Sequence, residues 1–137
     1  MTRRKNPEQQ IHLAVAQHLR SRGIPGMVWW HTPNGGQRNK AAGGLLKAMG
    51  MRAGVSDFIF VHANKIYALE LKAEGGRATD AQMQFLADID RAGARTAMPA
   101  GLDAALATLE SWGLLRPAIT SISEVLQRNV ARTLHGG

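Results

Sequence analysis

Two acidic residues and one lysine are of types that can bind a cation or transfer a proton, and their spacing could bring them together: Asp57, Glu70 and Lys72. Period-two alternation along residues 66–72 places Glu70 and Lys72 on one face of a predicted strand. A turn at Ala63-Asn64 would fold the preceding strand back, so that Asp57 lies opposite Glu70. Like charges that face each other across a ladder destabilise it. The pair therefore needs a cation, which either Lys72 or a divalent metal ion can supply.

The two interpretations of this cluster are a structural ion network at the edge of a sheet and a metal site. Hard cations such as Mg²⁺ bind through one or two carboxylates and keep other positions for water or phosphate. The chain has no cysteine, which excludes a disulfide scaffold, a thiolate zinc site and a cysteine nucleophile. None of the five histidines is four residues from another, so an ordinary helical zinc motif is not expected, although distant histidines could meet in space. Oxygen ligands favour Mg²⁺ or Mn²⁺.

The charge of the chain is divided unevenly along its length. Residues 1–56 contain nine Lys and Arg residues against one acid, Glu8, whereas residues 57–137 contain eight bases and nine acids. The whole excess of the net charge of +7 thus lies in the first half. Such an asymmetry indicates a polyanionic partner, most simply a nucleic acid.

The elements that must position these residues follow from periodicity, caps and turns. Helices are expected at residues 7–21, 39–49, 102–112 and 121–134 and in the segment that follows Thr79, and strands at residues 27–31, 55–61, 66–71 and 94–98. Asn6 and Pro7 mark the start of the first helix, and Thr79 with Gln82 forms a capping box. The order predicts an α/β protein with a mixed sheet flanked by helices. No stretch approaches the roughly 18 apolar residues of a membrane span, and no targeting signal is evident, so a cytoplasmic protein is expected.

Together with their neighbours, these residues resemble the PD-(D/E)xK nuclease superfamily and, within it, the VRR-NUC domain family. The matching segments occur in the same order as in the family: Glu8, His31–Gly36 with Arg38, Gly54–Asp57, Glu70–Lys72 and Thr79–Gln82. The resemblance implies a restriction-endonuclease-like fold for residues 1–113 and leaves residues 114–137 as a helical extension that it does not explain. Ser56 stands where the superfamily has proline, which removes a rigid turn but no metal ligand.

The resemblance also implies a role for each matched residue. The ligands of Mg²⁺ or Mn²⁺ would be Asp57, Glu70, the backbone carbonyl of Leu71 and Glu8. Lys72 would orient or help to deprotonate the attacking water. Gln82 would support that lysine, in addition to its capping role. Glu8 precedes Ile11 and Val15 by three and seven residues, so it is expected on the buried face of the first helix. The alternative to a metal-binding role for Glu8 is a favourable interaction with the positive end of the helix dipole.

A second set of matched residues lies in a loop that the family places near nucleic acid: Asn34, Gly35, Gly36, Arg38 and Lys40. The Asn-Gly-Gly sequence allows close approach to phosphate, although such a tripeptide more commonly forms a plain turn. Trp29 and Trp30 could stack on bases, but at least one of them is expected in the core.

The function that these observations favour is metal-dependent, structure-selective cleavage of DNA. The resemblance to small stand-alone members of the family implies a homodimer. A two-fold dimer suits a symmetric four-way (Holliday) junction. Flap cleavage and duplex nicking are alternative activities. Two further alternatives are a non-catalytic nucleic-acid-binding module on the same scaffold and a protein whose C-terminal helix binds another subunit.

Overall fold

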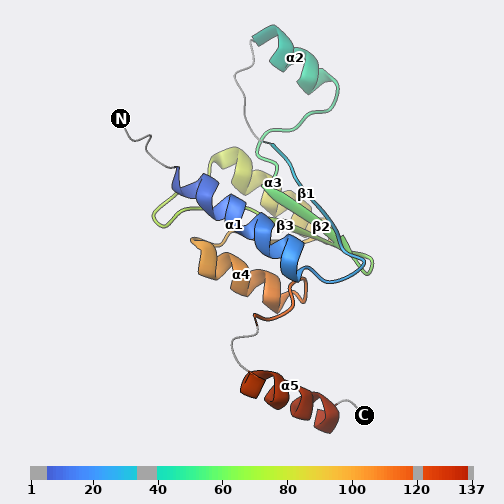
Figure 1. Cartoon of the computed structure of the whole chain (residues 1–137). Coiled ribbons are helices and arrows are strands. Elements are labelled where there is room, and N and C mark those ends of the chain that lie inside the picture. The colour runs from blue at the N-terminus through green and yellow to red at the C-terminus, as the bar shows by residue number, and fades with distance from the viewer. Residues whose placement is uncertain (1–5, 34–39, 119–121, 136–137) are drawn as a thin grey trace, which may run out of the picture.

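The computed structural model describes residues 6–33, 40–118 and 122–135 and contains one mixed four-stranded sheet within these ranges (Figure 1). The strands are β1 (Val28–His31), β2 (Phe58–His62), β3 (Lys65–Leu69) and β4 (Arg95–Ala97), in that spatial order. The β1–β2 and β2–β3 pairs are antiparallel, and β3–β4 is parallel. The helices are α1 (Pro7–Arg22), α2 (Lys40–Ala48), α3 (Asp80–Arg91), α4 (Leu102–Ser111) and α5 (Ile122–His135). The predicted α/β class and mixed sheet are therefore confirmed.

Helices cover both faces of the sheet. Alternate strand residues point to opposite faces, and each face carries apolar side chains that a helix buries. On one face, α1 and α4 pack on Phe58, Tyr67 and Leu69 in the main core. On the other face, α3 packs through Phe85 on a smaller cluster that contains Ala68. The period-two alternation predicted for the third strand is thus the one that the structure shows.

The hairpin that joins β2 and β3 has the predicted register. Its ladder runs from Phe58↔Leu69 to His62↔Lys65, and Ala63 and Asn64 form the turn with φ values of 49° and 65°. Two successive positive φ values match the turn geometry that suits the twist of a tight hairpin. This register brings the residues just before β2 beside those just after β3.

Side-chain caps fix the starts of the two helices that border this end of the hairpin. The Asn6 carboxamide accepts hydrogen bonds from the backbone N–H groups of Glu8 and Gln9, at 3.0 and 3.4 Å. Thr79 and Gln82 form the predicted capping box at the start of α3. These caps satisfy amide groups that would otherwise lack partners in the first helical turn.

The core includes residues that follow α4. Leu114 and Leu115 are buried in the main core, and the Leu114 carbonyl accepts a hydrogen bond from the Ile24 N–H. The packed domain therefore extends to Leu115, slightly beyond the boundary at residue 113 that the sequence predicts.

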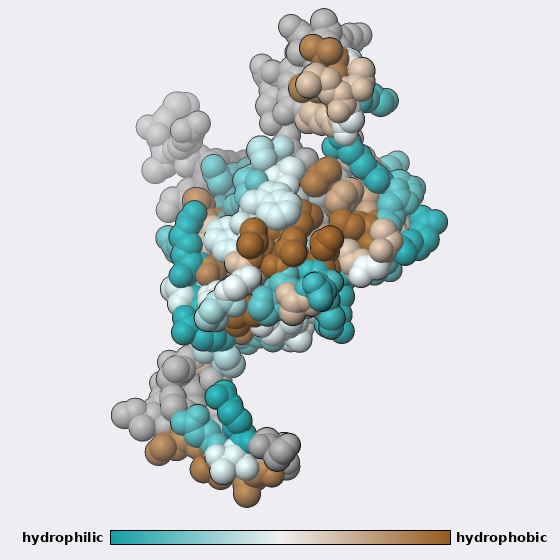
Figure 2. Space-filling model, turned by 90° about the vertical axis from the view of Figure 1, so that its right-hand side faces the viewer, coloured by the Kyte–Doolittle hydropathy of each residue, from teal (hydrophilic) through white to brown (hydrophobic). Residues whose placement is uncertain are grey.

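Two helices stand apart from the layered domain. Figure 1 shows α2 and α5 away from the sheet at opposite ends of the molecule, and Figure 2 shows apolar residues gathered along one side of α5. Among the side chains of α5 that the structure describes, the large exposed apolar ones are Leu126, Val130 and Leu134. Within the described ranges, no helix has the length and apolar character needed to cross a membrane.

Candidate active site

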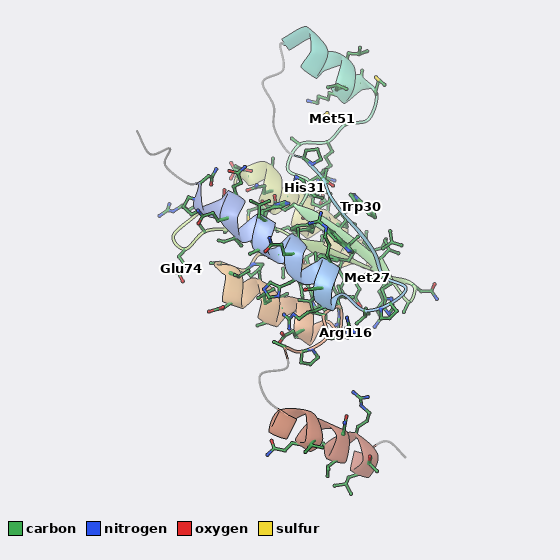
Figure 3. The ribbon with its side chains drawn as sticks, in the orientation of Figure 1. Met27, Trp30, His31, Met51, Glu74 and Arg116 are labelled. Atoms are coloured by element: carbon green, nitrogen blue, oxygen red, sulfur yellow. The ribbon has the colours of Figure 1, made fainter. Side chains whose placement is uncertain are left out.

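A cleft of about 520 Å³ opens where α1, the starts of β2 and α3, and the ends of β1 and β3 meet. Figure 3 shows His31 at this end of the sheet, close to α1. The residues that line the cleft are Asn6, Glu8, Gln9, His12, Leu13, His31, Asp57, Glu70, Leu71, Lys72 and Gln82. All six residues to which the resemblance assigns metal binding or catalysis therefore line one cavity: Glu8, Asp57, Glu70, Leu71, Lys72 and Gln82.

Asp57 and Glu70 are joined directly, one just before β2 and the other just after β3. The Asp57 N–H donates to Glu70 Oε2 at 3.3 Å, and the Leu71 N–H donates to Asp57 Oδ2 at 2.8 Å. Glu70 is only 2% exposed. Its burial, followed by the nearby charge of Asp57, raises the pKa of Glu70 to about 7. A bound cation would therefore favour the ionised form of Glu70.

Gln82 connects this acidic pair to Lys72. Its Oε1 accepts hydrogen bonds from Lys72 Nζ and from the Thr79 N–H, both at 2.9 Å. Its Nε2 donates to Glu70 Oε1 at 2.7 Å. The same side chain thus completes the capping box and holds the lysine and the glutamate.

Lys72 and Glu8 face each other across the cleft. Lys72 Nζ lies 3.7 Å from Glu8 Oε1 and 3.7 Å from Glu70 Oε1. The Glu8 side chain is 48% exposed, whereas the sequence predicts that it lies on a buried face. The difference arises because the first turn of α1 borders the open cleft and not the hydrophobic core.

Gly54 and Ser56 shape the loop that leads to Asp57. Gly54 has a φ of +79°, and a Cβ atom there would lie 2.3 Å from the backbone of Ala81 and 2.6 Å from the Gln82 nitrogen. Only glycine lets this loop contact the first turn of α3 so closely. Ser56 is fully buried, and its Oγ has no hydrogen-bond partner in the described part of the chain.

Two histidines to which the sequence pattern gives no role also line the cleft. The rings of His12 and His31 are 4.1 Å apart, and His12 stacks on Phe58 at 4.4 Å. Burial, followed by the proximity of His31, lowers the pKa of His12. His12 follows Glu8 by one helical turn, which places both side chains on one face of α1. This spacing is the feature of the sequence that could have indicated His12 as a cleft residue.

The loop residues expected to contact nucleic acid cannot be placed in the same way. Asn34, Gly35, Gly36 and Arg38 lie outside the described residues, and Lys40 begins α2 with a side chain that is also outside them. The two tryptophans differ, as expected. Trp29 packs against the main core, whereas Trp30 on the opposite face is 46% exposed.

Comparisons with known proteins agree with this architecture. The family model of the VRR-NUC domain, a nuclease-type domain family, matches residues 6–101. A solved structure described as a "VRR_NUC domain protein" superimposes with a TM-score of 0.64 at 19% identity, over 77% of this chain and 86% of the other. No curated protein matches the sequence. Since the family model spans more than half of the residues, the chain belongs to the VRR-NUC domain family.

Proposed function

We propose that this protein is a Mg²⁺- or Mn²⁺-dependent endodeoxyribonuclease that hydrolyses phosphodiester bonds. The observation that carries the proposal is the hydrogen-bonded group of Asp57, Glu70, Lys72 and Gln82 in one open cleft. Two carboxylates beside a lysine match the requirements of phosphodiester hydrolysis, which are a metal ion, an oriented water and charge neutralisation at phosphorus.

The residues present fit a hard divalent cation. Glu70 is buried beside Asp57, and its raised pKa reflects the cost of placing two negative charges together. We expect the ion to be held by Asp57, Glu70 and the Leu71 carbonyl, with Glu8 at the rim. When bound, such an ion supplies Lewis acidity and lowers the pKa of its water.

The side chains of the protein supply the remaining functions. The hydrogen bond from Lys72 Nζ to Gln82 Oε1 holds the ammonium group of the lysine beside the acidic pair of Asp57 and Glu70. From this position its ammonium group can orient a water or neutralise charge on the scissile phosphate. Gln82 also donates to Glu70, so it keeps the lysine and the glutamate in a fixed relation.

DNA is the substrate that the charge distribution supports. Nine of the 17 basic residues precede Asp57 together with a single acid, so contacts to the phosphate backbone would come chiefly from this half. We propose branched DNA, and a four-way junction in particular, because a two-fold dimer would present two clefts to two strands.

The homodimer that this substrate requires is supported by α5. Leu126, Val130 and Leu134 repeat at four-residue spacing, which forms an apolar stripe, and all three are exposed. We expect light scattering to give a dimer mass for the full chain and a lower mass for Val130→Glu. A monomer mass for the unaltered chain would contradict the dimer without affecting the proposed chemistry.

A cleavage assay on defined DNA substrates tests the function. Purified protein is incubated with junction, flap, linear duplex and single-stranded DNA in Mg²⁺, Mn²⁺ or EDTA. We expect cuts only with a divalent ion, and a loss of at least ~100-fold in rate for Asp57→Asn, because metal ions contribute several kcal/mol. Asp103→Asn, an exposed acid in the first turn of α4, is the matched control.

The outcomes of this assay separate the alternatives. Cleavage that survives EDTA, or equal rates for Asp57→Asn and the unaltered protein, would contradict the metal mechanism. DNA binding without cleavage under every metal would identify a non-catalytic binding module. The preferred substrate would distinguish junction resolution from flap cleavage and nicking.

A further inference from the structure

Three residues from distant parts of the chain bring a nitrogen-rich ligand set together inside the cleft. His12 comes from α1, His31 from the end of β1 and Asp57 from the start of β2. One potential ligand atom from each of them lies within 4.8 Å of the other two. Two imidazoles and one carboxylate can occupy one face of a metal ion and leave the remaining positions open.

His31 makes the kind of hydrogen bond that metal-binding histidines commonly make. Its Nδ1 lies 2.9 Å from the backbone carbonyl oxygen of Asp57. A carbonyl only accepts, so Nδ1 carries the proton, and the lone pair of the ring is on Nε2. Histidine ligands commonly donate their other ring N–H to a backbone carbonyl in this way, which fixes both tautomer and orientation.

His12 is held by packing against two other rings. Its ring stacks on the buried Phe58 at 4.4 Å with an interplanar angle of 30°, and it meets the His31 ring edge-on at 78°. Both histidines and Asp57 line the open cleft, so an ion and its waters have access to them. The site is thus constrained on the protein side and open on the solvent side.

We propose that His12, His31 and Asp57 form a second metal site, which takes a first-row ion of borderline softness such as Zn²⁺ or Co²⁺ in preference to Mg²⁺. Imidazole nitrogen suits these ions, whereas Mg²⁺ prefers oxygen ligands and gives up its water reluctantly. The chain contains no cysteine that could form a competing thiolate site. Metal binding at this site does not depend on the proposed cleavage reaction.

Calorimetric titration of the full chain, stripped of metal, tests the site with Zn²⁺ as the probe. The titration is carried out near neutral pH with excess Mg²⁺ present. The proposed magnesium site is then already filled, and Asp57, which belongs to both sites, can bind Zn²⁺ through its other carboxylate oxygen. We expect the unaltered protein to bind one Zn²⁺ and both His12→Gln and His31→Gln to weaken it by at least ~10-fold, since loss of a ligand should cost no less than loss of its supporting partner. His18→Gln, on the same helix but outside the cleft lining, should bind Zn²⁺ like the unaltered protein.

A second readout and a second variant keep the test decisive. Bound Co²⁺ should give a visible absorption spectrum that changes in His31→Gln. Because His31 is exposed, its substitution should leave the fold intact, so a changed spectrum would report on the metal site. Circular dichroism checks the fold of His12→Gln, because that residue packs on Phe58. Absence of Zn²⁺ binding in the unaltered chain, or equal affinity in both histidine variants and the unaltered chain, would overturn the inference.

The failure of this inference and the failure of the proposed function are distinguishable. If Lys72→Met abolishes cleavage while the two histidine variants bind Zn²⁺ normally, the nuclease proposal stands and the second site does not. If Zn²⁺ binding depends on both histidines but no DNA is cut with any metal, the second site stands alone.

Discussion

At the scale of single residues, the chemistry of the cleft depends on a carboxyl group that the fold places in an unfavourable environment. Glu70 is buried, lies beside Asp57 and accepts a hydrogen bond from Gln82. The pair was predictable because a two-residue turn and the period of a strand determine which side chains oppose each other. The adjacent His12 and His31 were not predictable, because their proximity depends on how α1 packs on β1.

The raised pKa of Glu70 predicts how the stability of the metal-free protein depends on pH. The carboxyl has a pKa of about 7 in the folded chain and its usual value of 4.5 when unfolded. Its contribution is therefore fully present below pH 4.5 and is lost as the pH rises through 7. We expect the free energy of unfolding to fall by about 3 kcal/mol over this range through this group alone.

Urea denaturation in EDTA at several pH values measures this effect. Glu70→Gln should remove most of the slope, because the substituted side chain does not titrate. Mg²⁺ added above pH 7 should restore stability to the unaltered protein through preferential binding to the folded state. A pH dependence that is identical in the two proteins would contradict the assigned environment of Glu70.

At the scale of elements, the site depends on contacts between segments that periodicity alone does not pair. The helices and strands follow the predicted ranges closely, because caps and apolar repeats are local signals. The close contact between the loop at Gly54 and the start of α3 was not predictable, since it requires knowledge of how those elements meet. This contact determines where Asp57 lies relative to Gln82.

Gly54→Ala is expected to disturb both stability and the site. Its Cβ would overlap the backbone of Ala81, so the first turn of α3 would have to shift and move Gln82 away from Lys72. We expect this variant to lose about 1–3 kcal/mol more than Gly75→Ala in chemical denaturation. Gly75 is the matched control, because it has nearly the same φ, +77° against +79°, but a Cβ added there would meet no atom within 4 Å. Equal losses in the two variants would show that the close contact is unimportant.

At the scale of the whole molecule, the chain consists of a layered domain and a terminal helix, α5, that stands apart from it. Both leucines after α4 are in the main core, whereas α5 stands apart with its apolar stripe exposed. The sequence predicts the helix itself from its periodicity. Whether that helix packs on its own domain depends on the complementarity of two surfaces, which a periodic pattern does not encode.

Leucine substitutions on either side of this division should differ in their effect on folding. Leu114→Ala would create a cavity in the core and is expected to cost about 2–5 kcal/mol. Leu126→Ala, on the exposed stripe of α5, should change the stability of the domain by less than about 0.5 kcal/mol. Chemical denaturation at low protein concentration checks both. A large loss for Leu126→Ala would show that α5 packs on the domain.

Metal-dependent cleavage of DNA, with the lysine held by Gln82 taking part, is the central proposal for this cleft. It is tested by the single-turnover cleavage rate in Mg²⁺ for the unaltered chain, Lys72→Met and Lys65→Met. Lys65 is an exposed lysine at the start of β3, whereas Lys72 follows the end of that strand, so Lys65→Met controls for loss of positive charge. We predict a fall of roughly 10²–10⁴-fold for Lys72→Met and little change for Lys65→Met. Equal rates for all three proteins would contradict a role for Lys72 in the reaction.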